Sequence, residues 1–136
     1  MKQSNFQFSD PNLIHLNFHI NDDFDSNDFE SIKIDGSTRV LKSKENNVAI
    51  VEFTLKIGEE DRNSPFYIEA VMKADFKWDE KLDAKIVENM LSINAPSLIV
   101  GYMRPIIANI TNMSQYPIFN LPFLNMQGNE ADIVEI

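Results

Sequence analysis

Cysteine is absent from the 136 residues of this chain, which excludes a disulfide framework, a thiol nucleophile and a thiolate metal site. Glycine is scarce, with four residues, and the sequence contains no Gly-rich phosphate loop and no nucleophile-elbow motif. Basic residues are also few, since 12 Lys and Arg face 21 Asp and Glu and leave a net charge of −9. Nucleic acids and anionic membranes are therefore not expected partners, because phosphate groups are bound by Lys and Arg.

Long apolar runs are missing as well. No segment approaches the roughly 20 apolar residues that cross a bilayer, and residues 1–12 lack the apolar region of a signal peptide. Hydrophobic residues still make up 43% of the chain, as in globular proteins with a packed core. We therefore expect one domain over residues 1–136, located in the cytoplasm and not inserted in a membrane.

Two patterns resemble metal sites but lack essential features. His15 and His19 have the spacing of a helical metal-binding pair, but they lie in a predicted strand, where four residues span about 13 Å. Read as a calcium loop from Asp23, the acidic stretch has Asp28 at the sixth position and Ile34 at the twelfth, where such a loop requires glycine and glutamate. We expect no metal site and no cofactor. No stretch gathers the titratable groups of an active site, so we expect no enzyme.

Apolar and polar residues alternate over four segments, which predicts four strands at residues 14–20, 32–42, 49–57 and 66–78. Short polar connections between them favour antiparallel pairing. Residues 1–12 predict a polar lead-in that ends in the turn Asp10-Pro11-Asn12. Gly36 predicts a bulge or a close approach inside the second strand.

Two helices are predicted after the strands. Asp79 is expected to cap a short amphipathic helix that residues 92–96 interrupt, and Ser97 is expected to cap a longer one, Ser97–Met113. Pro105 predicts a kink in that helix. Strands followed by helices indicate an α+β fold, a four-stranded antiparallel sheet with helices packed on one face. The acidic tail after Met126 is expected to fray.

An extended apolar strip follows the long helix, because Pro117 and Pro122 prevent further helix. Its large apolar residues are Tyr116, Ile118, Phe119, Leu121, Phe123 and Leu124. A chain of this size with two helices has difficulty burying all of them, together with Tyr67 and Val71. An excess of apolar surface marks a subunit contact or a binding groove. The equally weighted alternative is that the strip closes the core over the sheet.

Arg104 is a lone cation in a strongly apolar helix. One interpretation is an arginine on the helix flank that is capped locally or extends to solvent. The other is an ion pair across a subunit interface, and the sequence leaves both open.

Several stretches are similar to the signature region of SecB protein-export chaperones: Asn94-Ala95-Pro96, Tyr102-Met103-Arg104 and residues 116–126. Residues 66–70 resemble the last strand of that family, and the order of the strands agrees. Gly101 stands where SecB has proline, and Pro105 stands where it has glutamate. SecB also continues into a second long helix, whereas ten residues follow Met126 here.

The resemblance implies a homo-oligomer, a dimer or a tetramer, with Tyr102, Arg104, Ile106 and Ile110 at subunit contacts. It also implies a chaperone that holds unfolded polypeptides without ATP, with the six apolar strip residues lining the client groove. Glu69 matches an acidic position that contacts the translocase motor SecA. The short C-terminal region favours a divergent member, with an antitoxin as client or no role in export. The alternative from another class is an oligomeric structural or regulatory protein that uses the strip for its own assembly.

Overall fold

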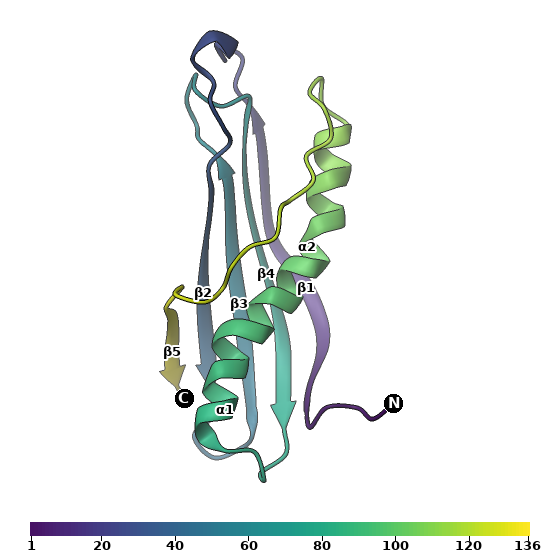
Figure 1. Cartoon of the computed structure of the whole chain (residues 1–136), viewed down its shortest axis with the longest axis vertical. Coiled ribbons are helices and arrows are strands. Elements are labelled where there is room, and N and C mark those ends of the chain that lie inside the picture. Colours follow the sequence, from purple (N-terminus) through teal and green to yellow (C-terminus); the bar gives the residue numbers. More distant parts are fainter.

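Five strands form one sheet with a continuous helical segment lying across one of its faces (Figure 1). The computed structural model describes residues 1–136, with the exception of the side chain of Asp28 in the acidic loop. The strands are β1 (Phe6–Ile20), β2 (Ile34–Lys42), β3 (Val48–Gly58), β4 (Phe66–Trp78) and β5 (Ala131–Glu135). Their spatial order is β1-β4-β3-β2-β5. The predicted α+β class and the helices on one face are confirmed.

The four predicted strands pair antiparallel, as expected. In β3 and β4 every second side chain is buried against the helices, which is the alternation that the sequence shows. Gly36 lies opposite Leu55 in an unbroken register, so there is no bulge at this position. A methyl group on Gly36 would lie 2.5 Å from Cζ of Phe53. Glycine is therefore required here by a close approach.

β1 is longer than predicted. It begins at Phe6, so the expected lead-in belongs to the strand, and Asp10-Pro11-Asn12 forms a bulge inside it. Asp10 has a φ of 51°, and a second irregularity lies between Leu13 and His15. Because β1 is at the edge of the sheet, Pro11 has no partner strand that needs its missing N–H.

The prediction of a frayed C-terminal tail is wrong. Residues 131–135 form β5, which pairs parallel with β2, from Thr38 opposite Ala131 to Lys42 opposite Glu135. The sheet is therefore five-stranded and mixed instead of four-stranded and antiparallel. Figure 1 shows the reason, since the chain crosses back over the sheet after the helix and arrives beside β2.

The two predicted helices are joined. α1 (Ala84–Asn89) continues through a π-helical turn, Met90–Asn94, into α2 (Ala95–Asn112). The expected break at residues 92–96 is absent because the N–H of Ala95 bonds to the carbonyl of Met90, five residues back, so the wider turn accommodates the missing N–H of Pro96.

The predicted helix caps are also wrong. Asp83, not Asp79, precedes α1, and Asp79 instead accepts a bond from the backbone N–H of Lys81. Ser97 lies within α2 and donates to the carbonyl of Ile93. α2 passes through Pro105 and ends at Asn112. The carbonyl of Gly101, which Pro105 leaves without a helical donor, belongs to an exposed residue and can be solvated.

The core lies between the sheet and the helices. Its large, fully buried side chains come from β2, β3, β4, α1, the π-helical turn and α2: Val40, Val51, Phe53, Leu55, Ile57, Ile68, Val87, Leu91, Ile99, Met103 and Ile107. Leu121 and Met126, which follow the helices, are also buried in it. The region after α2 is therefore partly structural, and its path determines the candidate site.

Candidate functional site

The strip, residues 116–124, leaves the end of α2 and crosses the same face of the sheet towards β5 (Figure 1). It has no regular secondary structure. Two side chains of α2 position it by hydrogen bonds to its main chain, Thr111 at the first half and Arg104 at the second. The strip is thus a third component of the layer that covers the sheet.

The six strip residues predicted to bind clients differ in burial. Leu121 is in the core, with 6% of its surface exposed. Tyr116, Phe119 and Leu124 are half-buried against the core, and the Tyr116 and Phe119 rings lie 6.3 and 6.2 Å from the ring of Phe66. The alternative in which the strip closes the core thus describes these four residues.

Ile118 and Phe123 remain at the surface. Ile118 is 47% exposed and Phe123 is fully exposed. Both side chains lie on a segment whose backbone is held by α2, so they are presented to solvent at fixed positions. Exposed apolar groups on an anchored segment are typical of a contact surface.

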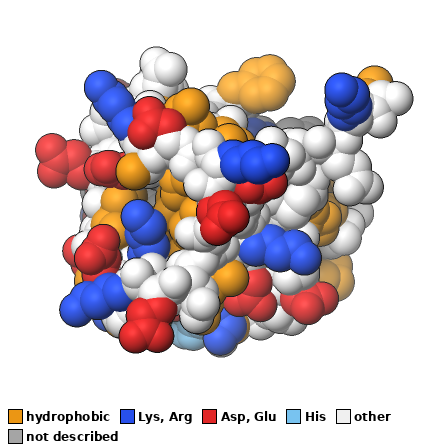
Figure 2. Space-filling view, turned by 90° about the horizontal axis from the view of Figure 1, so that it is seen from below, with side chains coloured by type: hydrophobic (Ala, Val, Ile, Leu, Met, Phe, Trp, Pro, Cys, Tyr) orange, Lys and Arg blue, Asp and Glu red, His pale blue; other side chains and the backbone are white. Residues whose placement is uncertain are grey.

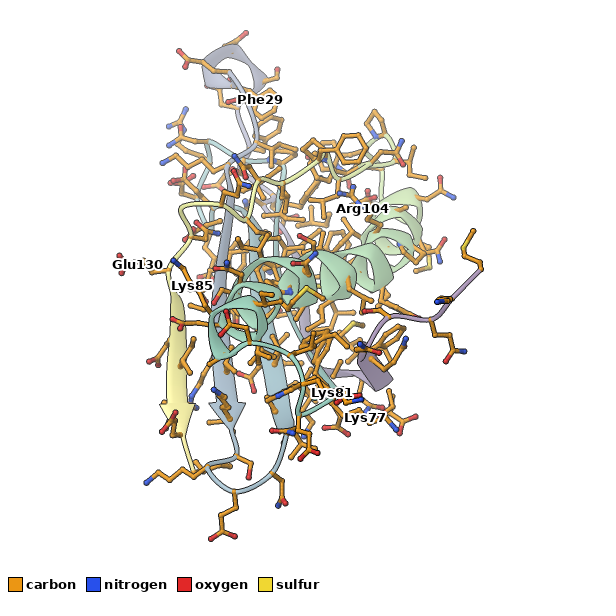
Figure 3. The ribbon with its side chains drawn as sticks, turned by 60° about the horizontal axis from the view of Figure 1, so that its bottom comes forward. Phe29, Lys77, Lys81, Lys85, Arg104 and Glu130 are labelled. Atoms are coloured by element: carbon orange, nitrogen blue, oxygen red, sulfur yellow. The ribbon has the colours of Figure 1, made fainter. Side chains whose placement is uncertain are left out.

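Arg104 holds the C-terminal half of the strip. Its guanidinium donates to the backbone carbonyls of Leu121 and Pro122, the latter at 2.9 Å, and its Cζ lies 5.7 Å from the centre of the Phe123 ring. Figure 3 shows Arg104 where the strip passes α2. This geometry matches the locally capped arginine of the sequence analysis.

Thr111 holds the other half, and sequence reasoning did not identify it. Its hydroxyl is fully buried, donates to the carbonyl of Ile107 at 2.8 Å and accepts from the N–H of Phe119 at 2.9 Å. The sequence feature that could have identified Thr111 is its position four residues after Ile107, on the apolar stripe of the helix. A buried hydroxyl at such a position requires a partner.

Replacing Arg104 with methionine should lower the free energy of unfolding by about 1–3 kcal/mol, because the two strip carbonyls lose a charged donor. Protease cleavage within residues 116–126 should also become faster, since the strip is released from α2. Urea denaturation and limited proteolysis measure the two effects. Arg62→Met is the matched control, because Arg62 makes only an exposed ion pair with Asp25, and it should change little. Equal effects in both variants would contradict the assigned role.

A second apolar surface, the β1–α2 surface, combines edge-strand residues with one side of α2. Its members are Leu13, Leu16, Tyr102, Ile106 and Met113. Leu13 and Leu16 lie opposite Met72 and Ala70, so they point to the face that carries the helices. Tyr102 contacts Phe8 of β1 edge to face at 6.0 Å. Helical spacing places Ile106 and Met113 on the side of Tyr102.

The four residues predicted at subunit contacts are therefore divided. Tyr102 is exposed, and Ile106 and Ile110 are half-buried on the flank of α2 near β1. Arg104 projects to the opposite flank, where it binds the strip. The structure brings Tyr102 and Ile106 together and separates Arg104 from them.

Glu69 lies on the sheet face away from the helices. Its carboxylate accepts from the Tyr67 hydroxyl at 3.0 Å and lies 3.2 Å from Nε2 of His15 and 4.0 Å from Nζ of Lys56. Partial burial raises the pKa of Tyr67, and the hydrogen bond and charge of Glu69 raise it further. The predicted contact with SecA would therefore use a carboxylate that already has three neighbours.

An apolar hollow of about 410 Å³ also opens at the strand ends, and Leu41, Val48, Ile50 and Ile136 contribute to its lining. Asp75 and Lys77 are the charged groups beside it. Within the described part of the chain, no helix is long and apolar enough to cross a bilayer. The same residues hold no group of three or more His, Cys, Asp or Glu side chains arranged for a metal ion.

Comparison with known proteins gives a structural match. The SecB-like chaperone Rv1957 of Mycobacterium tuberculosis, solved in complex with a ChAD peptide from the Rv1956 HigA1 antitoxin, has a TM-score of 0.70 to this chain. The match covers 88% of this chain and 91% of that one, at 11% sequence identity. This chain has a SecB-like fold. The resemblance predicted from the sequence is thus confirmed for the architecture.

Two further similar proteins carry no functional description. The uncharacterized protein MJ0357 of Methanocaldococcus jannaschii is 26% identical over 133 residues, which cover 96% of this chain and 85% of that protein. A protein of unknown function from Streptococcus agalactiae has a TM-score of 0.50 and 10% identity, covering 90% of this chain and 100% of that one. No family model matches the chain.

Proposed function

We propose that this chain is a SecB-like chaperone that binds non-native polypeptide segments without ATP and without catalysing a reaction. The observation that supports this most directly is the fold shared with Rv1957, a SecB-like chaperone solved with a bound peptide. The strip adds a surface of suitable chemistry, because it presents Ile118 and Phe123 to solvent beside the half-buried Tyr116 and Leu124.

The binding free energy in this proposal comes from burial of apolar area. An unfolded segment exposes large apolar side chains, and Phe123 and Ile118 offer partners that the fold leaves uncovered. The backbone of the strip is held by Arg104 and Thr111, so little ordering of the chaperone is required when a client binds. No nucleotide is needed to drive such an association.

The β1–α2 surface is proposed to join copies of the chain into a dimer or tetramer. It places exposed Leu13, Leu16 and Tyr102 on one flank. The outer edge of β1 adjoins this flank and is unpaired, with a regular register from His15 to Ile20. A regular edge next to exposed apolar groups favours pairing with a second strand.

A narrower form of the proposal is a chaperone for an antitoxin. The peptide bound to Rv1957 comes from an antitoxin, whereas a role in export would depend on contact between Glu69 and SecA. A toxin–antitoxin gene pair beside the gene for this chain would support the first form, and a translocase gene would support the second.

Aggregation of a chemically unfolded enzyme, such as malate dehydrogenase diluted from guanidinium, tests the proposed function. The chain should suppress light scattering at stoichiometric amounts in the absence of nucleotide, and an equal mass of serum albumin serves as control. Scattering that is unchanged at every ratio of chaperone to enzyme would reject chaperone activity. Negligible binding of the apolar dye ANS to the native protein would instead support a structural oligomer without free apolar surface.

A further inference from the structure

β5 closes the edge of the sheet at β2. Its five residues pair parallel with Thr38–Lys42. At the end of the strand, the N–H of Ile136 bonds to the carbonyl of Lys42 at 2.9 Å, and the N–H of Lys44 bonds to the carbonyl of Ile136 at 3.0 Å. The edge of β2 is thus occupied by a short strand from a distant part of the same chain.

β5 shows which side chains this edge accepts. Ala131 and Ile133 point to the helix face and are half-buried against the core. Asp132 lies opposite Arg39, and Glu135 lies opposite Lys42. The edge therefore suits an extended segment with alternate apolar residues and with acidic residues opposite the two cations of β2. Main-chain pairing of this kind depends little on sequence.

The space around β5 is incompletely filled. A hollow of about 430 Å³ lies beside Ala131 and Ile133, with Ser92 and Ile93 on its other side. A second hollow of about 250 Å³ lies between Ile133 and Leu91. Figure 2 shows apolar side chains between acidic and basic groups at the end of the molecule where α1 begins. Glu88, Glu130 and Glu135 also line these hollows. The edge therefore has space for side chains larger than those of β5.

The connection before β5 suits separation of this strand from the sheet while the strip stays in place. Met126 is buried and fixes the end of the region that crosses the sheet. A turn follows in which the N–H of Asn129 bonds to the carbonyl of Met126, and Gly128 has a φ of 87°. A side chain at Gly128 would meet nothing within 4 Å, so this position of the turn is not packed against the strip or the sheet.

We propose that β5 is a resident strand that a client displaces. In this inference, which rests on the proposed chaperone function, an extended non-native segment with alternate apolar residues pairs parallel with β2 in place of β5. Acidic residues opposite Arg39 and Lys42 strengthen its binding. Occupation of the edge by β5 keeps β2 from pairing with other chains when no client is present.

A reversible disulfide tests the displacement, because the natural chain has no cysteine. Leu41 and Val134 are paired across β2 and β5 on the face away from the helices, and the variant Leu41→Cys/Val134→Cys can lock β5 in place. Thr54→Cys/Val71→Cys is the matched control, since it joins β3 to β4 on the same face. The probe is fluorescein-labelled α-lactalbumin that has been reduced and carboxymethylated, and binding is followed by fluorescence anisotropy.

Oxidation of the two cysteines that join β2 to β5 should weaken binding of the probe by about tenfold or more, and dithiothreitol should restore the binding. Oxidation of the control cysteines should have no effect on binding. Unchanged binding of the probe to oxidised Leu41→Cys/Val134→Cys would overturn this inference and would not contradict the proposed function. A wild-type chain that does not bind the probe would reject both. Disulfide-linked dimers of the lock variant would show that β5 pairs with a second copy, which also overturns displacement by a client.

The charge preference has its own measurement. Two labelled peptides have apolar residues at the same positions as residues 127–136. One peptide has Glu and the other has Lys at the positions of Asp132 and Glu135. The Glu peptide should bind the full chain about fivefold more tightly, and Arg39→Glu/Lys42→Glu should reverse the order. Equal affinities would remove the charge preference from the inference.

Discussion

Replacing Leu121 with alanine is expected to lower the free energy of unfolding by about 2–5 kcal/mol, whereas Phe123→Ser should change it by less than about 0.5 kcal/mol. The two residues lie two positions apart in the strip, but Leu121 is 6% exposed and Phe123 is fully exposed. The first change leaves a cavity in the core, and the second removes a side chain from solvent. Urea denaturation followed by circular dichroism measures both values.

Client binding should show the opposite order. Phe123→Ser should raise the amount of protein needed for half-suppression of aggregation by about fivefold, which corresponds to roughly 1 kcal/mol of lost apolar contact. Leu121→Ala should retain suppression at temperatures where it is still folded. Asn120→Ser, at an exposed polar position of the strip, is the control and should alter neither quantity. Loss of suppression in Leu121→Ala alone would place the client elsewhere.

Glutamate at two positions of the β1–α2 surface should convert the proposed assembly to single chains of 15.6 kDa. The variant Leu16→Glu/Tyr102→Glu places like charges from two copies close together in the proposed interface, and such juxtaposition costs several kcal/mol. Both side chains are exposed in the single chain, at 38% and 45%, so the fold should tolerate the change. Light scattering coupled to size-exclusion chromatography measures the mass.

Val48→Glu/Ile86→Glu is the matched control, because both residues are exposed apolar groups outside this surface, and its mass should equal that of the wild type. A wild-type mass of 15.6 kDa at micromolar concentration would reject the proposed assembly. A mass that is unchanged in Leu16→Glu/Tyr102→Glu would instead place the subunit contact on another part of the molecule.

Much of the architecture could be predicted because it depends on local patterns. The alternation in residues 49–57 and 66–78 gave β3 and β4 and their buried faces, and the apolar spacing after residue 94 gave α2. The resemblance to SecB then assigned these elements to a known arrangement. The errors occurred where local signals had two outcomes. Asp10-Pro11-Asn12 resembles a turn, but at a sheet edge the same residues form a bulge.

The roles of individual side chains were harder to predict. The sequence predicts an apolar strip at residues 116–124, but the order of its residues does not tell which of them meet the core. Arg104 could be assigned only as capped or interfacial, since its partners are carbonyls of Leu121 and Pro122 on a segment that returns from the end of the helix. Thr111 is similar, because its partner Phe119 lies beyond the helix end.

The sequence by itself determined an acidic chain without cysteine, the four antiparallel strands, the helical region and an apolar strip with two prolines. These features follow from composition and from residue spacing within one element. The tertiary structure decided that Leu121 is buried and Phe123 is free, that Arg104 binds the strip, and that residues 131–135 complete the sheet as β5. These depend on contacts between segments far apart in the chain, and such contacts are set by the path of the whole backbone.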